Sequence, residues 1–485
     1  MINFKMIYKV LGLLLYIEAF LMLWCLVMSF HYQEDDLAAF AISVVTTVLA
    51  GCVMRFMGRD VNNSLSRREA YLVVTLAWVV FSLFGTMPFL ISGYVSNFTD
   101  AFFETMSGFT TTGATIISDV EALPHGLLFW RSLMQWVGGL GIVFFTIALL
   151  PSFVGGSVQI FAAEATGPMR TKLHPRLTTN TKAIWMIFTV LTIGCIATYK
   201  LLGMGWFDSV NYAMTMLATG GFAPHNDSIL HFQSAPIEYA SVIFCFLSGI
   251  NFTLLYCVLI KFDFKSLVKN SEVKFYIAMI VVATLFIIAE LMARNGYSIE
   301  NAFRSALFQV VSLVTTTGLF NDNVADWPRV TWLILIPCMF IGACSGSTSS
   351  GIKCVRGVML LKIVRNEFRQ ILHPNAVLPL KVNGVNIPQQ KRVTLLALFT
   401  LYLTVCFISL LILMAIGIDS TDAISITLGS VNNIGQPLSS GAADAVTWAT
   451  LPIFAKWMCT MLMLMGRLEI FNVLVIFTSA YWHEN

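Results

Sequence analysis

Four short stretches of the chain resemble one another and carry residues suited to binding an ion. They are SGFTTTGAT (107–115), MLATGGFAP (216–224), SLVTTTGLF (312–320) and SVNNIGQPL (430–438). The glycines predicted to be equivalent are Gly113, Gly220, Gly318 and Gly435. Glycine adopts backbone angles closed to other residues, and backbone carbonyl oxygens can replace the hydration shell of a monovalent cation such as potassium. The predicted chemistry is therefore cation coordination in a selectivity filter.

The predicted ion-binding residues are the three that end at each glycine. They are Thr111, Thr112 and Gly113; Ala218, Thr219 and Gly220; Thr316, Thr317 and Gly318; and Asn433, Ile434 and Gly435. Threonine hydroxyls and asparagine amides add further oxygen ligands. One TTTG string alone is a common loop sequence, whereas four copies in matching contexts favour a filter.

Each glycine loop follows a short apolar segment. These segments start near Asp100, Asp208, Glu300 and Asp422, and they are too short to cross a membrane. We expect half-helices that enter the membrane and turn back, with an acid capping the amino terminus and the carboxyl end directed at the ion. The third repeat departs from this pattern, because Ser305 stands at the spacing where Asp100 and Asp422 stand.

The composition identifies the surroundings of these loops. Of 485 residues, 57% are hydrophobic and 11% are charged, and the mean hydropathy is +0.78. Because a soluble domain carries about a quarter charged residues, a soluble enzyme is excluded and a membrane protein is predicted. The ten cysteines lie in or beside apolar stretches and are interpreted as small buried residues.

Ten apolar segments are long enough to cross a bilayer, and we interpret the first as a helix rather than a cleaved signal peptide. The predicted crossings are 10–30, 37–57, 70–93, 126–150, 182–203, 236–260, 273–293, 329–364, 392–416 and 446–478. The predicted fold is an all-α polytopic membrane protein with four helix–pore-helix–filter-loop–helix repeats around one pore, plus two extra N-terminal transmembrane helices. The predicted units are residues 1–62 (the two N-terminal helices), 63–170, 171–268, 269–380 and 381–485 (pore repeats 1 to 4).

The few charges are sorted between the two sides of the membrane. On this topology 22 of the 29 lysines and arginines fall on the N-terminal side, and 17 of the 26 acids fall on the other side. The excess of basic residues predicts that both termini are cytoplasmic. The acidic outer face would attract cations, although any single acid there is equally well explained by the topology.

The third inner helix is interrupted by a polar stretch. The stretch GACSGSTSSGIK contains the predicted gate residues Gly342, Ala343, Cys344, Ser345, Gly346, Ser347, Thr348, Ser349, Ser350 and Gly351. Glycine and serine lower helix propensity, and hydroxyls can bond the freed backbone groups. We interpret the stretch as a flexible loop beneath the filter, and a static kink is the alternative.

Arg467 is predicted to be the only basic residue deep within a crossing. Burial of arginine costs at least about 2.5 kcal/mol on insertion scales, so this side chain is expected to face a cavity or a partner. It could form an electrostatic barrier or bond the oxygens of the gate loop, and a salt bridge between helices is the alternative. Glu469 is nearby in sequence, but positions two apart on a helix do not face each other.

The four glycine loops in one chain resemble those of the Trk/Ktr/HKT superfamily of potassium transporters, and the two extra N-terminal helices resemble its TrkH branch. The resemblance implies a bacterial inner-membrane protein and a homodimer, with 342–351 as an intramembrane gate. A serine at the first filter glycine accompanies sodium transport in that superfamily. Gly113 therefore implies that potassium is the transported ion, with rubidium also passing.

The resemblance also implies a partner, a cytosolic nucleotide-binding regulatory ring of the TrkA type that binds ATP, ADP or NAD. No P-loop or dinucleotide-binding motif follows a strand here, so no organic cofactor is expected on this chain. Basic residues from Arg170 to Lys182 and from Lys353 to Arg369 fit anionic lipid headgroups or this ring. No nucleic-acid partner is expected.

The sequence predicts a channel-like potassium uptake protein, and two other classes of function are the alternatives. A coupled potassium/proton or potassium/sodium symporter often has inverted repeats, whereas these four repeats share one orientation. An intramembrane enzyme would need an HExxH motif, paired intramembrane aspartates or a Ser/His arrangement, and the sequence shows none of them. The sequence favours a transporter that is not an enzyme.

Overall fold

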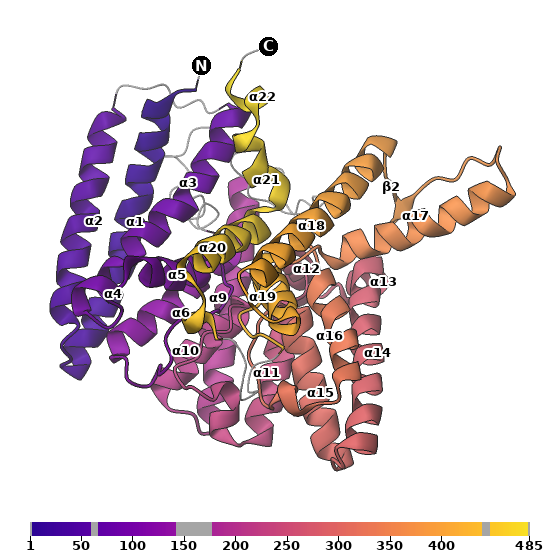
Figure 1. The fold of residues 1–485 in the computed structure, drawn as a ribbon, viewed down its shortest axis with the longest axis horizontal. Helices are drawn as coiled ribbons and strands as arrows, with labels where there is room; N and C mark the ends of the chain where they lie inside the picture. The colour runs from indigo at the N-terminus through magenta and orange to yellow at the C-terminus, as the bar shows by residue number, and fades with distance from the viewer. Residues whose placement is uncertain (1, 60–65, 142–176, 439–446, 484–485) are drawn as a thin grey trace.

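The computed structural model describes residues 2–59, 66–141, 177–438 and 447–483. Two long apolar helices, α1 (Phe4–Tyr32) and α2 (Leu37–Met57), stand side by side at one edge of the molecule (Figure 1). A Cβ atom on Gly12 would lie 2.8 Å from the carbonyl oxygen of Gly51. The missing side chains therefore let the two helix backbones approach closely, as small residues do in membrane helices.

Four repeats follow this pair, each with an outer helix, a short half-helix and an inner helix. Repeat 1 has α3 (Arg67–Gly85), α4 (Met87–Ser92), α5 (Phe98–Phe109) and α6 (His125–Leu140). Repeat 2 has α9 (Leu177–Leu201), α10 (Trp206–Leu217), η1 (Ser228–Phe232), α11 (Ala235–Ser248), α12 (Phe252–Lys261) and α13 (Phe264–Lys269).

Repeat 3 has α14 (Ser271–Arg294), α15 (Ile299–Val314), η2 (Val324–Asp326), α16 (Arg329–Ile341) and α17 (Cys354–Leu372). A short antiparallel hairpin, β1 (Lys381–Val382) and β2 (Val385–Asn386), leads to repeat 4. That repeat has α18 (Gln389–Ala415), α19 (Ser420–Asn432), η3 (Trp448–Thr450), α20 (Ile453–Leu468), α21 (Ile470–Leu474), η4 (Val475–Phe477) and α22 (Ser479–Trp482). The all-α polytopic fold predicted from the sequence is confirmed.

The half-helices α5, α10, α15 and α19 are the short segments predicted before each glycine loop. Their acids Asp100, Asp208, Glu300 and Asp422 lie in the first turn, where a negative charge interacts favourably with the helix dipole. The N-cap itself is a different residue. Asn97, Ser298 and Asp419 accept the capping hydrogen bonds of α5, α15 and α19, and Gly205 precedes α10. The prediction that the first-turn acids are the caps was wrong by a few residues.

Among the described residues, three of the inner helices are broken, whereas the sequence predicted a break only at residues 342–353. Helices α11 and α12 are bent by 105° at their junction, and α20 and the α21–η4 segment by 114°. Residues 342–353 separate α16 from α17, and α6 ends at Leu140, beyond which the predicted crossing lies outside the described residues. Within the described part of the chain, six helices pass a length and hydropathy test for membrane spans, or eight if each bent pair is one span. A break in the inner helix is therefore shared by repeats 2, 3 and 4.

The outer helices present apolar side chains to the surroundings. Only 22% of the most apolar window of α18 is buried inside the molecule, and 28% of that of α2. These surfaces suit contact with lipid tails. The chain ends meet at one end of the molecule, because the Asn3 backbone N–H donates to Glu69 and the Tyr481 hydroxyl donates to the Arg68 carbonyl (Figure 1). The two ends of the described chain therefore lie close together.

Candidate functional site

The four glycine loops meet in a closed ring. A Cβ atom placed on a ring glycine would collide with, or closely approach, the backbone of the next loop, so the loops are in direct backbone contact. The contacts run from Gly113 to Gly220, from Gly221 to Thr317, from Gly318 to Gly435 and from Gly435 back to Gly113. The loops therefore surround one axis in chain order, as the sequence predicted.

The backbone conformation defines which residues of the loops are equivalent. The residues in the left-handed region are Thr111 (φ 55°), Thr219 (φ 53°), Thr316 (φ 60°) and Asn433 (φ 56°). Glycines with φ between 77° and 80° follow two positions later at Gly113, Gly221 and Gly318. The residue between them donates its N–H to a carbonyl five positions upstream, from Thr112 to Ser107, Gly220 to Thr215, Thr317 to Ser312 and Ile434 to Gly429.

The second predicted triplet is consequently shifted by one residue. Gly221, not Gly220, is the structural equivalent of Gly113, and Thr219–Gly221 rather than Ala218–Gly220 is the equivalent of 111–113. Ala218 caps the carboxyl end of α10 instead. With Gly221 as the reference, Asp208 stands at the same spacing from its ring glycine as Asp100 and Asp422, which removes the irregularity seen in the sequence.

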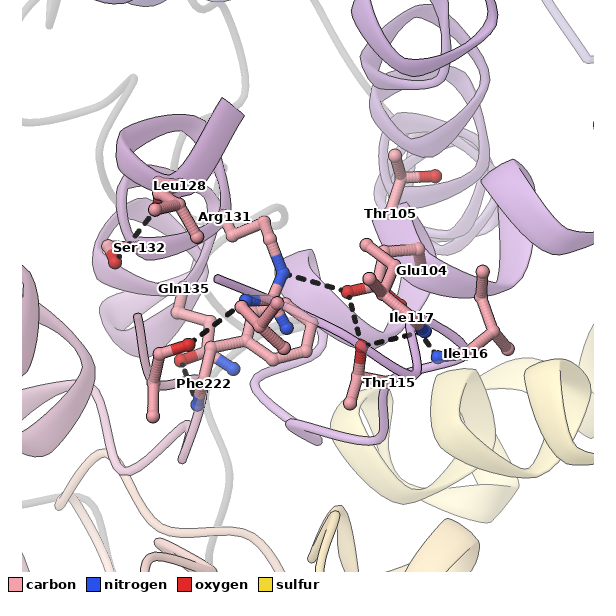
Figure 2. Close-up of polar contacts among 12 residues, drawn as sticks. Glu104, Thr105, Thr115, Ile116, Ile117, Leu128, Arg131, Ser132, Gln135 and Phe222 are labelled. Atoms are coloured by element: carbon pink, nitrogen blue, oxygen red, sulfur yellow. Dashed lines mark hydrogen bonds and ion pairs between the residues drawn. The ribbon is translucent and has the colours of Figure 1, made fainter. Parts of the chain in front are cut away.

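The space beside each loop explains why residue 220 is also glycine. Gln135 of α6 donates from Nε2 to the carbonyl of Gly220 (2.8 Å) and accepts from the N–H of Phe222 (3.1 Å), as Figure 2 illustrates for Gln135 and Phe222. A side chain at position 220 would collide with the Gln135 amide. At the equivalent Thr317, the small Cys245 of α11 lies there instead, with its Sγ 3.0 Å from Thr317 Oγ1.

A small loop residue faces a large helix residue at Gly220 and Gln135, and a larger loop residue faces a small one at Thr317 and Cys245. This pairing of side-chain volumes can be tested by measuring the stability of variants. We expect Gly220→Thr to destabilise the protein by about 1–3 kcal/mol, because it overpacks a filled site. Adding Gln135→Cys, which copies the arrangement at Thr317, should recover most of that loss. The measurement is the thermal unfolding midpoint of the purified protein in detergent. A double variant that is less stable than Gly220→Thr alone would contradict the packing explanation.

A buried ion pair bonds the segments that follow the first two loops. The Nε of Arg131 on α6 lies 2.9 Å from Oε1 of Glu104 on α5, and these side chains are 2% and 0% exposed (Figure 2). Glu104 also accepts from the Thr115 hydroxyl (3.0 Å) and the Ile116 N–H (3.0 Å), while Arg131 donates to the Ala223 carbonyl (3.1 Å). The pair thus holds the segments that leave both loops in fixed positions.

This pair was not predicted from the sequence. Arg467 is also not the only deeply buried basic residue, because Arg131 and Lys353 are buried as well. A usable signal was present, because an acid and a base in two successive apolar segments of one repeat are expected to pair when both are buried.

The predicted gate loop, residues 342–353, lies against the ring. Thr348 donates from Oγ1 to the Leu217 carbonyl (3.0 Å), and the Ser350 N–H donates to Thr316 Oγ1 (2.9 Å). Three glycines in the loop have positive φ, namely Gly342 (71°), Gly346 (77°) and Gly351 (79°). The loop therefore contacts the residues that precede the ring glycines in repeats 2 and 3.

Arg467 joins this loop to the ring. From the last turn of α20, its guanidinium donates to Thr111 Oγ1 (3.1 Å), the Thr348 carbonyl (2.8 Å) and Ser350 Oγ (3.3 Å). It also donates to the carbonyls of Gly138 (2.6 Å) and Gly139 at the end of α6. The acceptors in the gate loop, Thr348 and Ser350, agree with the sequence prediction, whereas Thr111, Gly138 and Gly139 were not predicted. The Glu469 carboxylate pairs instead with Arg356 of α17 at 2.6 Å.

Three further residues anchor the gate loop, and two of them, Glu272 and Asn251, were not singled out from the sequence. Glu272 of α14 accepts from the N–H groups of Ser345 (2.5 Å) and Val355 (3.1 Å), which lie near the two ends of the loop. Asn251, in the break between α11 and α12, donates to the Ser345 carbonyl (2.5 Å). The Lys353 ammonium donates to the Ser349 carbonyl. The contacts of Glu272 and Asn251 join distant parts of the chain and leave no local pattern in the sequence.

The fold and the ring define an all-α polytopic membrane protein built from four pore-like repeats. A family model described as TrkH, cation transport protein, matches residues 36–484. The Trk system potassium uptake protein TrkH of Halomonas elongata is 35% identical over 99% of this chain and 100% of its own length. The protein of the same name from Escherichia coli K12 is 34% identical over the same shares, and the Trk system potassium uptake protein TrkG of that strain is 31% identical over 98% and 97%.

A solved structure agrees with these relatives. The crystal structure of the potassium transporter TrkH from Vibrio parahaemolyticus superimposes with a TM-score of 0.90 and is 33% identical, covering 99% of this chain and 100% of the other. The chain belongs to the TrkH family of cation transport proteins.

Proposed function

We propose that this protein takes up potassium across the bacterial inner membrane by a channel-like path through the ring of four glycine loops. The observation that carries the proposal is the closed backbone contact among the loops in chain order. In this proposal, backbone oxygens of residues 111–113, 219–221, 316–318 and 433–435 coordinate a monovalent cation that sheds its water in the ring. The names of the relatives, which are potassium uptake proteins, support the choice of ion.

The gate in this proposal is the loop at 342–353, held closed by Arg467. The loop is joined directly to α17, a helix that projects from the body of the molecule (Figure 1) and exposes Arg365 and Arg369. A cytosolic nucleotide-binding ring of the TrkA type that docks on this basic arm would pull on the loop through Lys353. Nucleotide chemistry then belongs to the partner, and this chain supplies the ion path within a homodimer whose termini are cytoplasmic.

The test of transport uses cells that lack their own potassium uptake systems. We expect the chain to restore growth at low potassium and the purified protein to carry rubidium into liposomes. Flux without any proton or sodium gradient supports the channel-like path, whereas a strict requirement for one of these gradients would indicate a coupled symporter. Absence of potassium and rubidium uptake by folded, membrane-inserted protein would refute the proposal.

Selectivity gives a more direct test of the ring. We expect Gly113→Ser to raise sodium flux relative to potassium flux, because a side chain at this position is forced against the Gly220 carbonyl and displaces it from the ion path. Gly93→Ser is the matched control, since Gly93 has nearly the same φ (80° against 79°) but open space around it. The ratio of sodium to rubidium flux in liposomes is the measurement. An unchanged ratio in the Gly113 variant would remove this residue from the filter.

A further inference from the structure

Three side chains outside the ring form a cluster of metal-binding type. Glu121 lies in the segment that leaves the first loop, His225 follows the second loop, and His231 lies in η1. One ligand atom from each residue lies within 4.8 Å of the others. The cluster stands on the opposite side of the ring glycines from the gate loop, because the gate contacts the residues that precede those glycines.

The contacts within the cluster bring its donor atoms together. His225 Nδ1 lies 3.2 Å from Oε1 of Glu121, and its Nε2 lies 3.3 Å from Oδ1 of Asp208. The rings of His225 and His231 are stacked, with centroids 3.6 Å apart and planes 3° apart. A neutral imidazole binds a metal through a ring nitrogen, and His225 and His231 each offer one such nitrogen.

The backbone beneath the cluster is already fixed. The Asn226 side chain donates to Oδ1 of Asp119 (2.9 Å), and the Val120 N–H donates to Oδ1 of Asn226 (2.8 Å). These bonds join the segment that carries Glu121 to the segment that carries His225. A metal ion would therefore find two of its ligands held at short range by a scaffold that needs no metal, which lowers the entropic cost of binding.

We propose that Glu121, His225 and His231 bind a divalent transition metal ion, with zinc as the best match. Two imidazoles with one carboxylate suit zinc, whereas magnesium and calcium prefer oxygen ligands alone. Tetrahedral zinc needs donor atoms about 3.3 Å apart at bond lengths near 2.0–2.1 Å. Because the nitrogen lone pairs lie in the planes of the two stacked rings, His231 must turn out of the stack to bind the same ion as His225, and its exposed side chain leaves room for that turn. A water or Asp208 completes the coordination.

Because the site lies beside the loops, bound zinc is expected to slow cation transport. Bound zinc would cross-link the segments that leave loops 1 and 2 and add two positive charges beside the entrance to the ring, so it would lower cation entry. This consequence depends on the proposed uptake function. The binding itself does not, so the two are measured separately.

Binding is tested with the purified full-length protein in detergent, titrated with zinc chloride by calorimetry and compared with magnesium chloride. Two carboxylates, first Asp208 and then Glu121, raise the pKa of His225. The titration is therefore done at about pH 8, where protons compete less with zinc for the imidazole. We expect one zinc per chain and a loss of affinity of at least about tenfold in the double variant His225→Ala/His231→Ala. His373→Ala, which removes an exposed histidine after α17, is the matched control and should bind as the unaltered protein does.

The single variants Glu121→Gln and His231→Ala keep the test usable if the double variant does not fold, because both side chains are exposed. Unchanged affinity and stoichiometry in these folded variants would overturn the site. Liposome flux is then measured with and without zinc, each variant relative to its own zinc-free flux. Inhibition of the unaltered protein that is lost in the variants supports the effect on entry. Zinc that binds without slowing flux overturns that effect, and absence of flux before zinc is added counts against the uptake function instead.

Discussion

Replacing Gly221 with alanine is expected to abolish potassium uptake. Gly221 has a φ of 80°, which costs a residue with a side chain about 1–3 kcal/mol. More important, its Cβ would collide with the carbonyl oxygen of Thr317 in the next loop. That oxygen is a backbone atom of the ring, so the collision cannot be relieved by a side-chain rotation, and the third loop must move away from the axis.

The control for this substitution is Gly93→Ala, because Gly93 has the same φ of 80° but no heavy atom within 4 Å of the added Cβ. It carries the backbone strain without the collision and should retain most of the uptake. Rubidium uptake, normalised to the amount of folded protein in the membrane, is the measurement. If Gly221→Ala transports at the level of Gly93→Ala, the contact between loops 2 and 3 is not part of the ion path.

Gly221 is also the residue at which the loop register predicted from the sequence was shifted by one position. The string LATGG contains two adjacent glycines, and the choice of Gly220 left Asp208 one residue out of step with Asp100 and Asp422. An ungapped alignment of LATGG with VTTTG places Gly221 opposite Gly318, so the correct register was available in the sequence. What the sequence could not reveal is why residue 220 is glycine, because the cause is the side chain of Gln135 from another helix.

The broken inner helices show the same limit. The break at 342–353 was predicted because glycines and serines gather there in large number. The break after α11 has a weaker signal, Gly249 and Asn251, and depends on contacts with another repeat. The Asn251 side chain bonds the Ser345 carbonyl, and the Phe252 N–H bonds the Gly346 carbonyl. When a helix ends because its backbone groups bond to distant residues, its own sequence does not predict where it ends.

Buried charge was predicted where it is isolated in sequence and missed where it is paired. Arg467 stood out because its neighbours are apolar, and it bonds the gate-loop oxygens of Thr348 and Ser350, as predicted. Glu104 and Arg131 lie on different helices and form one pair, so neither signals its role alone. The fold and the ring were therefore predictable from repetition and hydropathy, whereas the polar contacts that set the ring's geometry required the three-dimensional structure.

The second large effect is expected at Arg467. Its guanidinium bonds the first ring loop through Thr111, the gate loop through Thr348 and Ser350, and the end of α6 through Gly138 and Gly139. A hydrogen bond to a charged group contributes about 1.5–3 kcal/mol, and about 1.4 kcal/mol shifts an equilibrium tenfold. Loss of the bonds to the gate loop in Arg467→Ala should therefore raise rubidium flux through the unregulated protein by about tenfold or more.

Arg467→Lys separates the two roles that this residue could have. Lysine keeps the positive charge but has one compact ammonium group, which cannot reach the ring, the gate loop and α6 together as the planar guanidinium does. If Arg467 acts as a hydrogen-bonded latch, the lysine variant should leak ions as the alanine variant does. If it acts as an electrostatic barrier, the lysine variant should keep the low flux of the unaltered protein. Because size-exclusion chromatography shows which variants remain assembled, a variant that falls apart instead of leaking would assign Arg467 to structural support. We expect the latch, since five acceptors from three segments of the chain converge on one side chain.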